Sequence, residues 1–328
     1  MREFQDMRSH HDMGGQPAGP VARGEHVLAI WEKRVDALAM LLGERGLRRV
    51  DEARRQIEAL APNAYDAMTY YERWMAAIGS GLLARGVVTA DEIARAMSEV
   101  EARLLAERAA HDGLDHDHDH AHDHAHLPHP KQPDEEDAPL AYYQVMEIAV
   151  RELLIAKGII SPADIRRAIE RMDGRTPDQG ARVVAKAWTD PAFKARLLLN
   201  GAAACRELGI DMGETHLVVL ENTPELHNIV VCTLCSCYPR MVLGLPPDWY
   251  KSRAYRSRVV REPRAVLAEF GTAIPDNVAV RVHDSTADMR YLVLPERPKG
   301  TEGWSEERLA GLVTRDSMIG VARASEPG

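Results

Sequence analysis

One segment of the chain, HDGLDHDHDHAHDHAHLPHPKQPDEEDA at residues 111–138, has almost nothing apolar to bury. Its composition predicts a disordered linker, because such a segment cannot offset the entropy lost when a backbone is ordered. The linker divides the 328 residues into two parts, each long enough for its own hydrophobic core. Eight of the 14 histidines fall within it, so it can collect divalent cobalt, nickel or zinc. A plain solvated tether is the alternative.

The part before the linker has a helical pattern. Apolar side chains recur at helical spacing along one face, at Val27, Trp31, Val35, Leu38 and Leu42. Thr89-Ala-Asp-Glu92 has the pattern of a capping box that opens a further helix. We therefore predict a helical domain at residues 26–110, preceded by an extended arm at residues 1–25.

The part after the linker, residues 139–328, changes its period along the way. Helical patterns come first, and four short β-branched runs follow, at residues 216–223, 228–232, 278–282 and 290–295. The predicted fold class is therefore α+β, with helices ahead of a sheet region.

An internal repeat connects the two parts. The tyrosine pair at residues 70–71 lies ahead of Gly86, and the pair at residues 142–143 lies ahead of Gly158, at a constant offset of 72 positions. Both copies have the pattern of a helix, a glycine C-cap, a short turn and a capped helix. We predict a duplicated helical hairpin whose copies pack about a local pseudo-twofold axis; the alternative is that unrelated helical hairpins look alike.

Charge and apolar content exclude several classes of protein. The formal net charge of −9 argues against nucleic acid or an anionic membrane as the main partner. The opening MREFQDMRSHHDMGGQPAGP has no apolar core of a signal peptide, and no apolar run is long enough to span a membrane. Four cysteines, three of them clustered, do not form a secreted disulfide framework. We expect a cytoplasmic protein.

The cysteine cluster lies in VCTLCSCYPR at residues 231–240, which contains Cys232, Cys235 and Cys237. A zinc knuckle or half of an iron–sulfur site are the plain alternatives. A structural zinc site takes four ligands, usually from two separated pairs. The remaining cysteine, Cys205, lies in the apparently helical GAAACRELGI, where a buried structural thiol is the favoured role.

The spacing favours a different geometry. In C-x-x-C-x-C the backbone amides of Ser236 and Cys237 can face the same point as the three sulfurs. A metal acidic enough to deprotonate amides would take three sulfurs and two nitrogens, with one position open. An open position on a Lewis-acidic ion indicates catalysis, and the thiolates are candidates for controlled oxidation.

Longer strings carry a family resemblance. VCTLCSCYP, LGLPPDWYKSRAYRSRVVREPRAVLAEFG, RYLVLPERPKGTEGWSEERL and VTRDSMIGVA resemble the α subunit of nitrile hydratase, and Thr233 resembles its cobalt branch. The resemblance implies a helical arm and a layered α-β-β-α core. It also implies one non-corrin Co(III) per chain, rather than Fe(III), held by the three cysteine sulfurs and the amides of Ser236 and Cys237. Cys232 would stay a thiolate, Cys235 become a sulfinate and Cys237 a sulfenate.

The part before the linker resembles the N-terminal helical half of nitrile hydratase β, in HDMGG (11–15), VDEAR (50–54) and YYERW (70–74). The resemblance implies that Arg54 contacts the oxygens of the oxidised cysteines and that Tyr70 and Tyr71 line or support the pocket. A guanidinium suits such oxygens because it offers paired donors. Without the resemblance, Arg54 would be interpreted as a surface arginine on a charged helix.

Two departures from the family pattern bear on partners and substrate. The small β-barrel that normally follows the helical half of β, with a second arginine, is missing before the linker; we expect a separate barrel-type subunit, a hetero-oligomer and possible help from a cobalt activator protein. Arg240-Met241 stands where the α family usually has Trp-Pro. Thiocyanate hydrolase, a relative with the same cobalt site, resembles this chain in its split β-like part and in an arginine at this position.

The predicted function is hydration of a nitrile to an amide, with Cys237, Ser236 and Arg54 as catalytic residues and Tyr70, Tyr71 and Arg240 in the substrate pocket. One alternative is a subunit of thiocyanate hydrolase. An alternative of another class is a cobalt-delivery or activator protein, because the helical part and the histidine tract are also compatible with metal delivery.

Overall fold

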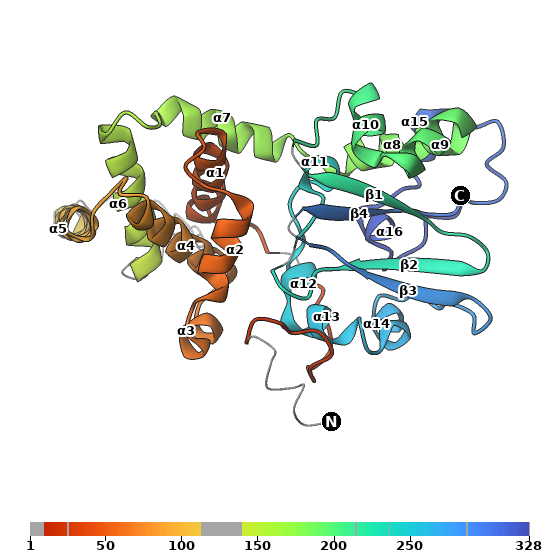
Figure 1. The fold of residues 1–328 in the computed structure, drawn as a ribbon, viewed down its shortest axis with the longest axis horizontal. Helices are drawn as coiled ribbons and strands as arrows, with labels where there is room; N and C mark the ends of the chain where they lie inside the picture. The colour runs from red at the N-terminus through yellow and green to blue at the C-terminus, as the bar shows by residue number, and fades with distance from the viewer. Residues whose placement is uncertain are drawn as a thin grey trace, which may run out of the picture. The chain divides into compact units, whose positions relative to one another are not determined.

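The computed structural model describes residues 10–24, 26–112, 140–213, 215–235, 237–286 and 288–327. These residues form two compact units (Figure 1). The sheet unit combines the described parts of Met1–Leu28, Glu58–Ala67 and Arg167–Gly328, and the helical unit combines those of Ala29–Ile57 and Met68–Arg166. The predicted linker lies outside the described residues from residue 113 onward.

The helical unit is built from amphipathic helices. Its helices are α1 (Ile30–Glu44), α2 (Val50–Glu58, up to Ile57), α4 (Tyr70–Ala84), α5 (Ala90–Asp112), α6 (Tyr142–Ala156) and the start of α7 (Pro162–Asp173). Val35, Leu38 and Leu42 are completely buried, as their spacing predicts. The prediction was wrong for Val27, which precedes the helix and is 89% exposed. Helix α1 begins later because the Glu32 side chain caps the backbone N–H of Ala29.

The two copies of the predicted repeat have the same local geometry. Gly86 and Gly158 follow α4 and α6 with φ of 66° and 68°, the left-handed conformation that favours glycine after a helix. Within each tyrosine pair, at residues 70–71 and 142–143, the ring centroids are 5.1 Å apart and the rings are nearly perpendicular. The duplicated helix, glycine cap and turn are therefore confirmed as local structure.

Helix α6 comes from the part after the linker but packs on α1, α4 and α5. The close approach of α4 depends on Gly79, because a Cβ there would meet the Met146 methyl group. The side chain of Glu147 is completely buried on α6 and accepts a hydrogen bond from Arg151 at 2.7 Å. The helical unit therefore contains residues from both sides of the predicted linker.

The sheet unit contains the four predicted strands, each within a few residues of its expected position. They are β1 (His216–Glu221), β2 (Leu226–Val231), β3 (Ala279–Asp284) and β4 (Met289–Leu294). Strands β1 and β4 form one parallel pair, and β2 and β3 form another. A parallel pair needs a long crossover. Between β2 and β3 that crossover contains the cysteine cluster and four helices, α11 (Arg240–Leu243), α12 (Asp248–Lys251), α13 (Arg253–Arg258) and α14 (Pro263–Glu269).

Helices cover the two sheets on opposite sides (Figure 1). On the β1–β4 side lie α8 (Pro177–Thr189), α9 (Pro191–Leu199) and α10 (Gly201–Glu207); on the β2–β3 side lie α13 (Arg253–Arg258) and α14 (Pro263–Glu269). Helix α16 (Arg315–Ile319) contacts both β2 and β4. The layered α-β-β-α core that the resemblance implies is therefore present.

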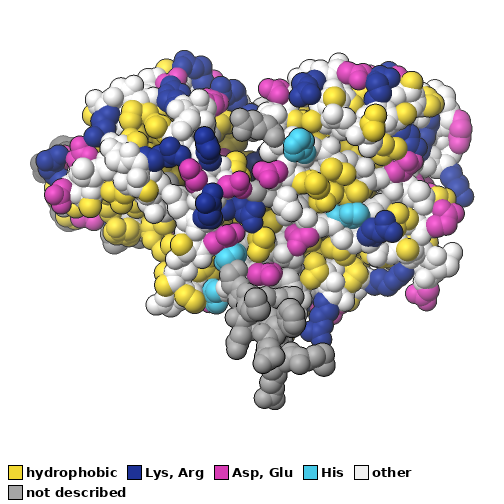
Figure 2. All heavy atoms as spheres, in the orientation of Figure 1, with side chains coloured by type: hydrophobic (Ala, Val, Ile, Leu, Met, Phe, Trp, Pro, Cys, Tyr) yellow, Lys and Arg dark blue, Asp and Glu magenta, His cyan; other side chains and the backbone are white. Residues whose placement is uncertain are grey.

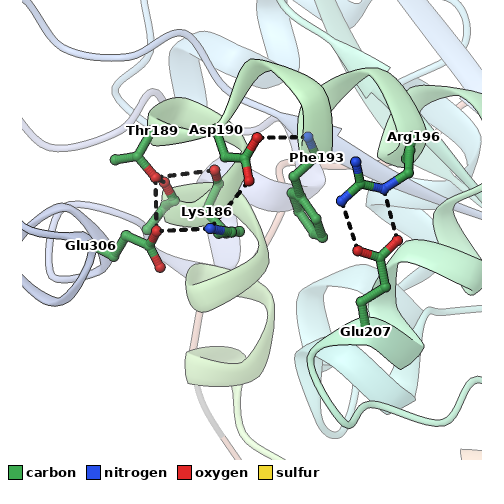
Figure 3. Close-up of polar contacts among 8 residues, drawn as sticks. Lys186, Thr189, Asp190, Phe193, Arg196, Glu207 and Glu306 are labelled. Carbon is green, nitrogen blue, oxygen red and sulfur yellow. Dashed lines mark hydrogen bonds and ion pairs between the residues drawn. The ribbon is translucent and has the colours of Figure 1, made fainter.

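Polar contacts fix the corner between α8 and α9 (Figure 3). Asp190 ends α8 and caps α9, where its carboxylate accepts the Phe193 N–H at 2.9 Å; such caps contribute about 1 kcal/mol. Lys186 pairs with Asp190 at 3.2 Å, and Arg196 binds Glu207 through two hydrogen bonds of 2.9 and 2.8 Å. These ion pairs are largely solvent-exposed, so each contributes little to stability.

Basic and acidic side chains are interspersed over both units on the face drawn in Figure 2. Among the described residues, no helix combines the length and the apolar character needed to cross a membrane.

Gly320 follows the last residue of α16, and we predict that it tolerates substitution poorly. Its φ is +91°, and an added Cβ would clash with the backbone carbonyl oxygen of Asn228 on β2. We expect Gly320→Ala to lower the free energy of unfolding by more than about 3 kcal/mol, because conformational strain and a backbone clash add. Gly271→Ala is the matched control, since Gly271 also has positive φ (+79°) but open space around it; it should cost only about 1–2 kcal/mol. Chemical denaturation measures both, and equal losses would contradict the clash.

Candidate metal centre

The cysteine loop, residues 232–237, begins where β2 ends. Val231, the last residue of β2, is completely buried and paired in register with Asp284 at the end of β3. Thr233 then donates its backbone N–H to Asp284 at 3.0 Å and its hydroxyl at 2.6 Å. The start of the loop is therefore fixed to the ends of two paired strands.

The three predicted cysteine ligands converge. Cys232 Sγ lies 3.8 Å from Cys235 Sγ, which lies 3.2 Å from Cys237 Sγ. Within the described part of the chain, these residues form the one group of three or more potential ligand side chains suited to a metal ion, with ligand atoms within 4.8 Å of one another. The fourth predicted member, Ser236, lies outside the described residues.

The contacts among the thiols also shape their acidity. Hydrogen bonds from the side chains of Cys235 and Cys237 hold the pKa of the buried Cys232 thiol well below its usual range. The same contact with Cys232 raises the pKa of Cys235 well above its usual range and that of Cys237 to about 12. One proton leaves readily, and the resulting charge opposes loss of the other two. A metal cation would offset that repulsion, so the donor set fits a thiolate-bound metal.

The loop backbone is held from outside by side chains that the sequence did not single out. The Tyr250 hydroxyl, on α12 (Asp248–Lys251), donates to Cys237 O at 2.8 Å. Arg256 on α13 donates to the carbonyl oxygens of Cys232, Thr233 and Leu234. Arg256 lies in SRAYRSRVVREPR, where five arginines occur, and no local pattern distinguishes it from the other four.

Arg290 is a second arginine that the sequence did not indicate. It lies on β4 and is 8% exposed. Its positive charge lowers the pKa of Cys237, against the larger opposing effect of Cys232. The run RYLVLP predicted the strand correctly, but the pattern alone does not show that the charge of this arginine acts on a thiol.

The N-terminal arm contacts the same loop. The Met13 N–H donates to Thr233 O at 3.3 Å, and the Gly15 N–H donates to Ser257 O at 2.7 Å. A Cβ on Gly14 would lie 3.2 Å from the Thr233 methyl group, so only a small residue fits there without a shift. The HDMGG string thus lies on the cysteine loop, and its residues are outside helices and strands.

Three other predicted site residues belong to the helical unit. Arg54 is half-buried on α2. Tyr71 is 2% exposed, and its hydroxyl lies 3.5 Å from Asp36, so it is part of the core of that unit. Tyr70 is half-buried, with its ring centroid 5.4 Å from that of Trp74. The cysteines belong to the sheet unit.

Arg240 and Cys205 belong to the sheet unit. Arg240 opens α11 (Arg240–Leu243) and is half-buried; its charge acts on the buried hydroxyl of Tyr238, whose pKa burial raises above the usual range. Cys205 is helical and completely buried, as predicted, and burial raises its pKa to about 12. Cys205 is therefore a structural thiol that is not a member of the cluster.

The comparisons with known proteins cover both parts of the chain. Residues 141–322 match the family model described as nitrile hydratase, alpha chain, and residues 7–127 match that described as nitrile hydratase beta subunit, N-terminal. The cobalt-containing nitrile hydratase subunit alpha of Pseudonocardia thermophila is 56% identical over 180 residues, which are 54% of this chain and 88% of that subunit. The nitrile hydratase subunit beta of Pseudomonas putida is 39% identical over 92 residues, covering 27% of this chain and 42% of that subunit.

Two further similarities concern a relative and a solved structure. Thiocyanate hydrolase subunit gamma of Thiobacillus thioparus is 46% identical over 198 residues, 57% of this chain and 81% of that subunit. A double mutant of the Fe-type nitrile hydratase from Comamonas testosteroni Ni1 aligns with a TM-score of 0.53 at 48% identity, covering 55% of this chain and 89% of that chain.

We predict that substitution of Cys232 removes the metal and that substitution of Cys205 does not. The full chain, produced with cobalt, should hold about one cobalt per chain. Cys232→Ala should reduce this by about tenfold or more, because it removes the most buried sulfur of a three-sulfur set. Cys205→Ala should retain the metal, since Cys205 lies outside the cluster. Elemental analysis of the purified variants tests both, and cobalt retained in Cys232→Ala would contradict the site.

Proposed function

Because the chain belongs to the nitrile hydratase α-chain family and carries the N-terminal part of a β subunit ahead of it, we propose that it is the catalytic chain of a cobalt nitrile hydratase. The reaction adds water to a nitrile and gives the amide. The observation that carries the proposal is the convergence of the sulfurs of Cys232, Cys235 and Cys237 within 4.8 Å in one short loop.

Cobalt is the metal of this centre, consistent with the cobalt-containing relative and the three-cysteine donor set. In the proposed site Cys232, Cys235 and Cys237 hold Co(III), together with the amide nitrogens of Ser236 and Cys237. Bound there, the ion would supply Lewis acidity to polarise a substrate or water. The chain's own part is to orient the three sulfurs, to exclude bulk water around them and to keep one side of the loop accessible.

The proposed oxidation states follow the exposure of the sulfurs. Cys232 is completely buried, Cys237 is 8% exposed and Cys235 is half-buried. Oxidation of a thiolate requires access of the oxidant, so the innermost sulfur is the one expected to stay a thiolate. This supports the assignment of a sulfinate to Cys235 and a sulfenate to Cys237, with the Cys237 oxygen directed to the substrate carbon or to water.

Arg54 is proposed to bind the oxygens on the oxidised sulfurs, since a guanidinium offers paired donors to such oxygens. Tyr70 is proposed to line the substrate pocket, and Tyr71 to support it from the core of the helical unit. The support for Tyr71 is its burial at 2% exposure and its contact with Asp36.

A separate subunit is proposed to complete the enzyme. The β-like match covers 42% of the Pseudomonas putida β subunit, and the α-like match begins only 14 positions after the β-like one ends. No room exists between the two matches for the rest of a β subunit. We propose a hetero-oligomer with a small β-barrel-type subunit that carries a second arginine for the sulfur oxygens. A cytoplasmic location and loading by a cobalt activator protein are further parts of this proposal.

Thiocyanate hydrolysis is the second candidate, because of Arg240. This arginine lies three residues after Cys237, where the family usually has tryptophan. A permanent positive charge in a partly desolvated pocket favours an anion over a neutral nitrile. The 46% identity with thiocyanate hydrolase subunit gamma is compatible with either substrate.

The hydratase proposal is tested by turnover with and without a partner. Co-expressed with cobalt and a barrel-type β subunit, the chain should convert a small aliphatic nitrile to its amide, measured by chromatography. The turnover rate of the chain alone should be lower by about 100-fold or more, which is the typical effect of losing one donor to the reacting group. Peptide mass spectrometry of the active preparation should find two added oxygens on Cys235 and one on Cys237.

Two outcomes would contradict parts of this proposal. Equal turnover by the isolated chain would remove the need for a barrel subunit. A cobalt-loaded, oxidised complex without amide product from any nitrile would remove the hydratase activity itself. Cys205→Ala is the matched cysteine control and should retain turnover.

Arg240 is predicted to set the preference between the two substrates. Arg240→Trp should shift the ratio of kcat/KM for thiocyanate to that for a neutral nitrile toward the nitrile by about tenfold, the effect of one modest charge contact. Arg240→Lys keeps the charge and should leave the ratio near that of the wild type. An unchanged ratio in Arg240→Trp would show that this side chain does not act on substrate.

A further inference from the structure

Arg256 combines deep burial with partners that all belong to the cysteine loop or the N-terminal arm. Its side chain belongs to α13 and is 2% exposed. Its Nε donates to Cys232 O at 3.2 Å, and its Nη2 donates to Thr233 O at 2.9 Å and to Leu234 O at 2.6 Å. One guanidinium therefore binds three consecutive carbonyl oxygens of the cysteine loop.

One of these contacts acts on a peptide group with both ends engaged. The carbonyl oxygen of Leu234 and the N–H of Cys235 belong to the same peptide bond. The oxygen accepts from Arg256, and the N–H donates to Cys232 Sγ at 3.3 Å. Since the two groups of a trans peptide point in opposite directions, a guanidinium on the oxygen directs the N–H toward the sulfur. The charge also polarises the peptide and strengthens its donor end.

The charge of Arg256 has no carboxylate partner among the described residues: none lies within ion-pair distance of its guanidinium, and every hydrogen bond from its side chain goes to a backbone carbonyl. A buried cation without a counter-charge is costly. Once the thiols of the cysteine loop ionise around a metal, they carry negative charge. They belong to the same short loop whose carbonyl oxygens Arg256 contacts. The loop backbone therefore connects a buried cation to a cluster of thiolates.

The other two arginines of α13 have different neighbours. Arg253, one turn earlier on α13, contacts the side chain of Gln16 in the N-terminal arm at 2.8 Å. Arg258 contacts Gly19 O in the same arm, and pairs with carboxylates. Of these three arginines of α13, only Arg256 contacts the cysteine loop, and its contact with the arm, to His11 O, is 3.5 Å long.

We propose that Arg256 is a positioning residue of the metal centre. It fixes the carbonyl oxygens of residues 232–234 away from the sulfurs, holds the Cys235 N–H on the Cys232 sulfur, and balances the negative charge of the thiolates. The proposal rests on the proposed function, because it takes Cys232, Cys235 and Cys237 as the ligands of cobalt.

The test is cobalt binding by the full-length, reduced chain under anaerobic conditions. Co(II) is titrated in competition with a chelator, and the sulfur-to-cobalt charge-transfer band is recorded. Arg256→Met removes the charge and the donors while it keeps most of the length, and should weaken cobalt binding by about 10–100-fold, as loss of partners that orient ligands typically does. Its charge-transfer band should shift, because the Cys232 sulfur loses an oriented hydrogen bond.

Arg256→Lys retains the charge but not the planar fork, so its affinity should lie between those of Arg256→Met and the wild type. Arg253→Met is the control for loss of an α13 arginine that contacts the arm, and should bind cobalt as the wild type does. If Arg256→Met does not fold, Arg256→Lys decides by itself, and must bind at least about threefold more weakly than Arg253→Lys.

Thermal unfolding of the same variants separates positioning from packing. A lower Tm in Arg256→Met with unchanged cobalt affinity and an unshifted band would overturn the proposal. Equal affinities of Arg256→Lys and Arg253→Lys would overturn it as well. Failure of the wild-type chain to bind cobalt under these conditions would instead count against the proposed metal centre, and the role of Arg256 would fall with it.

Discussion

Three thiols within 4.8 Å of one another repel once they ionise, and this repulsion is the constraint to which the sheet unit must respond. The loop between Cys232 and Cys237 is too short to contain a core of its own. Its conformation is therefore imposed from outside, by hydrogen bonds that Tyr250 and Arg256 donate to its backbone and by those that Thr233 donates to Asp284. Each partner reaches the loop from a different element, so the sulfurs remain together only in the folded unit.

The two parallel strand pairs make that arrangement possible. The pairing of β2 with β3 places Asp284 opposite Val231, one residue before the loop begins. The long crossover from β2 to β3 then returns through α12 and α13, whose buried faces carry Tyr250 and Arg256. A hairpin connection between β2 and β3 would leave no chain to form this enclosure. The cysteine loop is thus the first part of the crossover from β2 to β3, and later parts of the same crossover supply its partners Tyr250 and Arg256.

The parts of the fold that sequence could predict are those governed by local pattern. The β-branched runs predicted all four strands, the capping box at Thr89 is formed by reciprocal contacts with Glu92, and the cysteine spacing indicated the metal site. The pairing of β1 with β4 and of β2 with β3 could not be derived, because strand periodicity contains no information on partners.

The residues that were missed act at long range in the chain. Arg256 lies 24 positions from Cys232 in the sequence and contacts it directly. Arg290 acts on Cys237 from β4, although the sequence shows only an arginine at the start of a strand. In contrast, Val27 was assigned to a helical face by spacing alone, and the cap on Ala29 excludes it. Local periodicity thus fails in two ways, at helix ends and wherever a charge is buried by tertiary contacts.

The helical unit shows what the fusion of two subunit-like parts achieves. Glu147 on α6 lies 4.0 Å from Arg34 on α1, so a charge from each side of the predicted linker meets in one unit. Burial raises the pKa of the Glu147 carboxyl despite this arginine and Arg151. A raised pKa in the folded state means that folding favours the protonated Glu147. The stability that this protonated carboxyl contributes is complete below its unfolded-state pKa and is lost as the pH rises through its folded-state pKa. The attraction of Arg151 and Arg34 therefore does not offset the cost of burying the Glu147 carboxylate.

Apolar burial and covalent connection remain as the sources of the association between α1 and α6. Val150 and Leu154 on α6 are completely buried in the helical unit, and each such side chain contributes about 1.5–3 kcal/mol. Because α5 and α6 belong to one chain, their encounter is intramolecular, and covalent connection gives an effective concentration on the order of millimolar. Separate α and β chains at micromolar concentration would need about 4 kcal/mol of additional interface energy for the same occupancy. The fusion can therefore tolerate a buried, poorly compensated carboxyl group such as that of Glu147 in a contact that an interface between separate subunits would have to make more apolar.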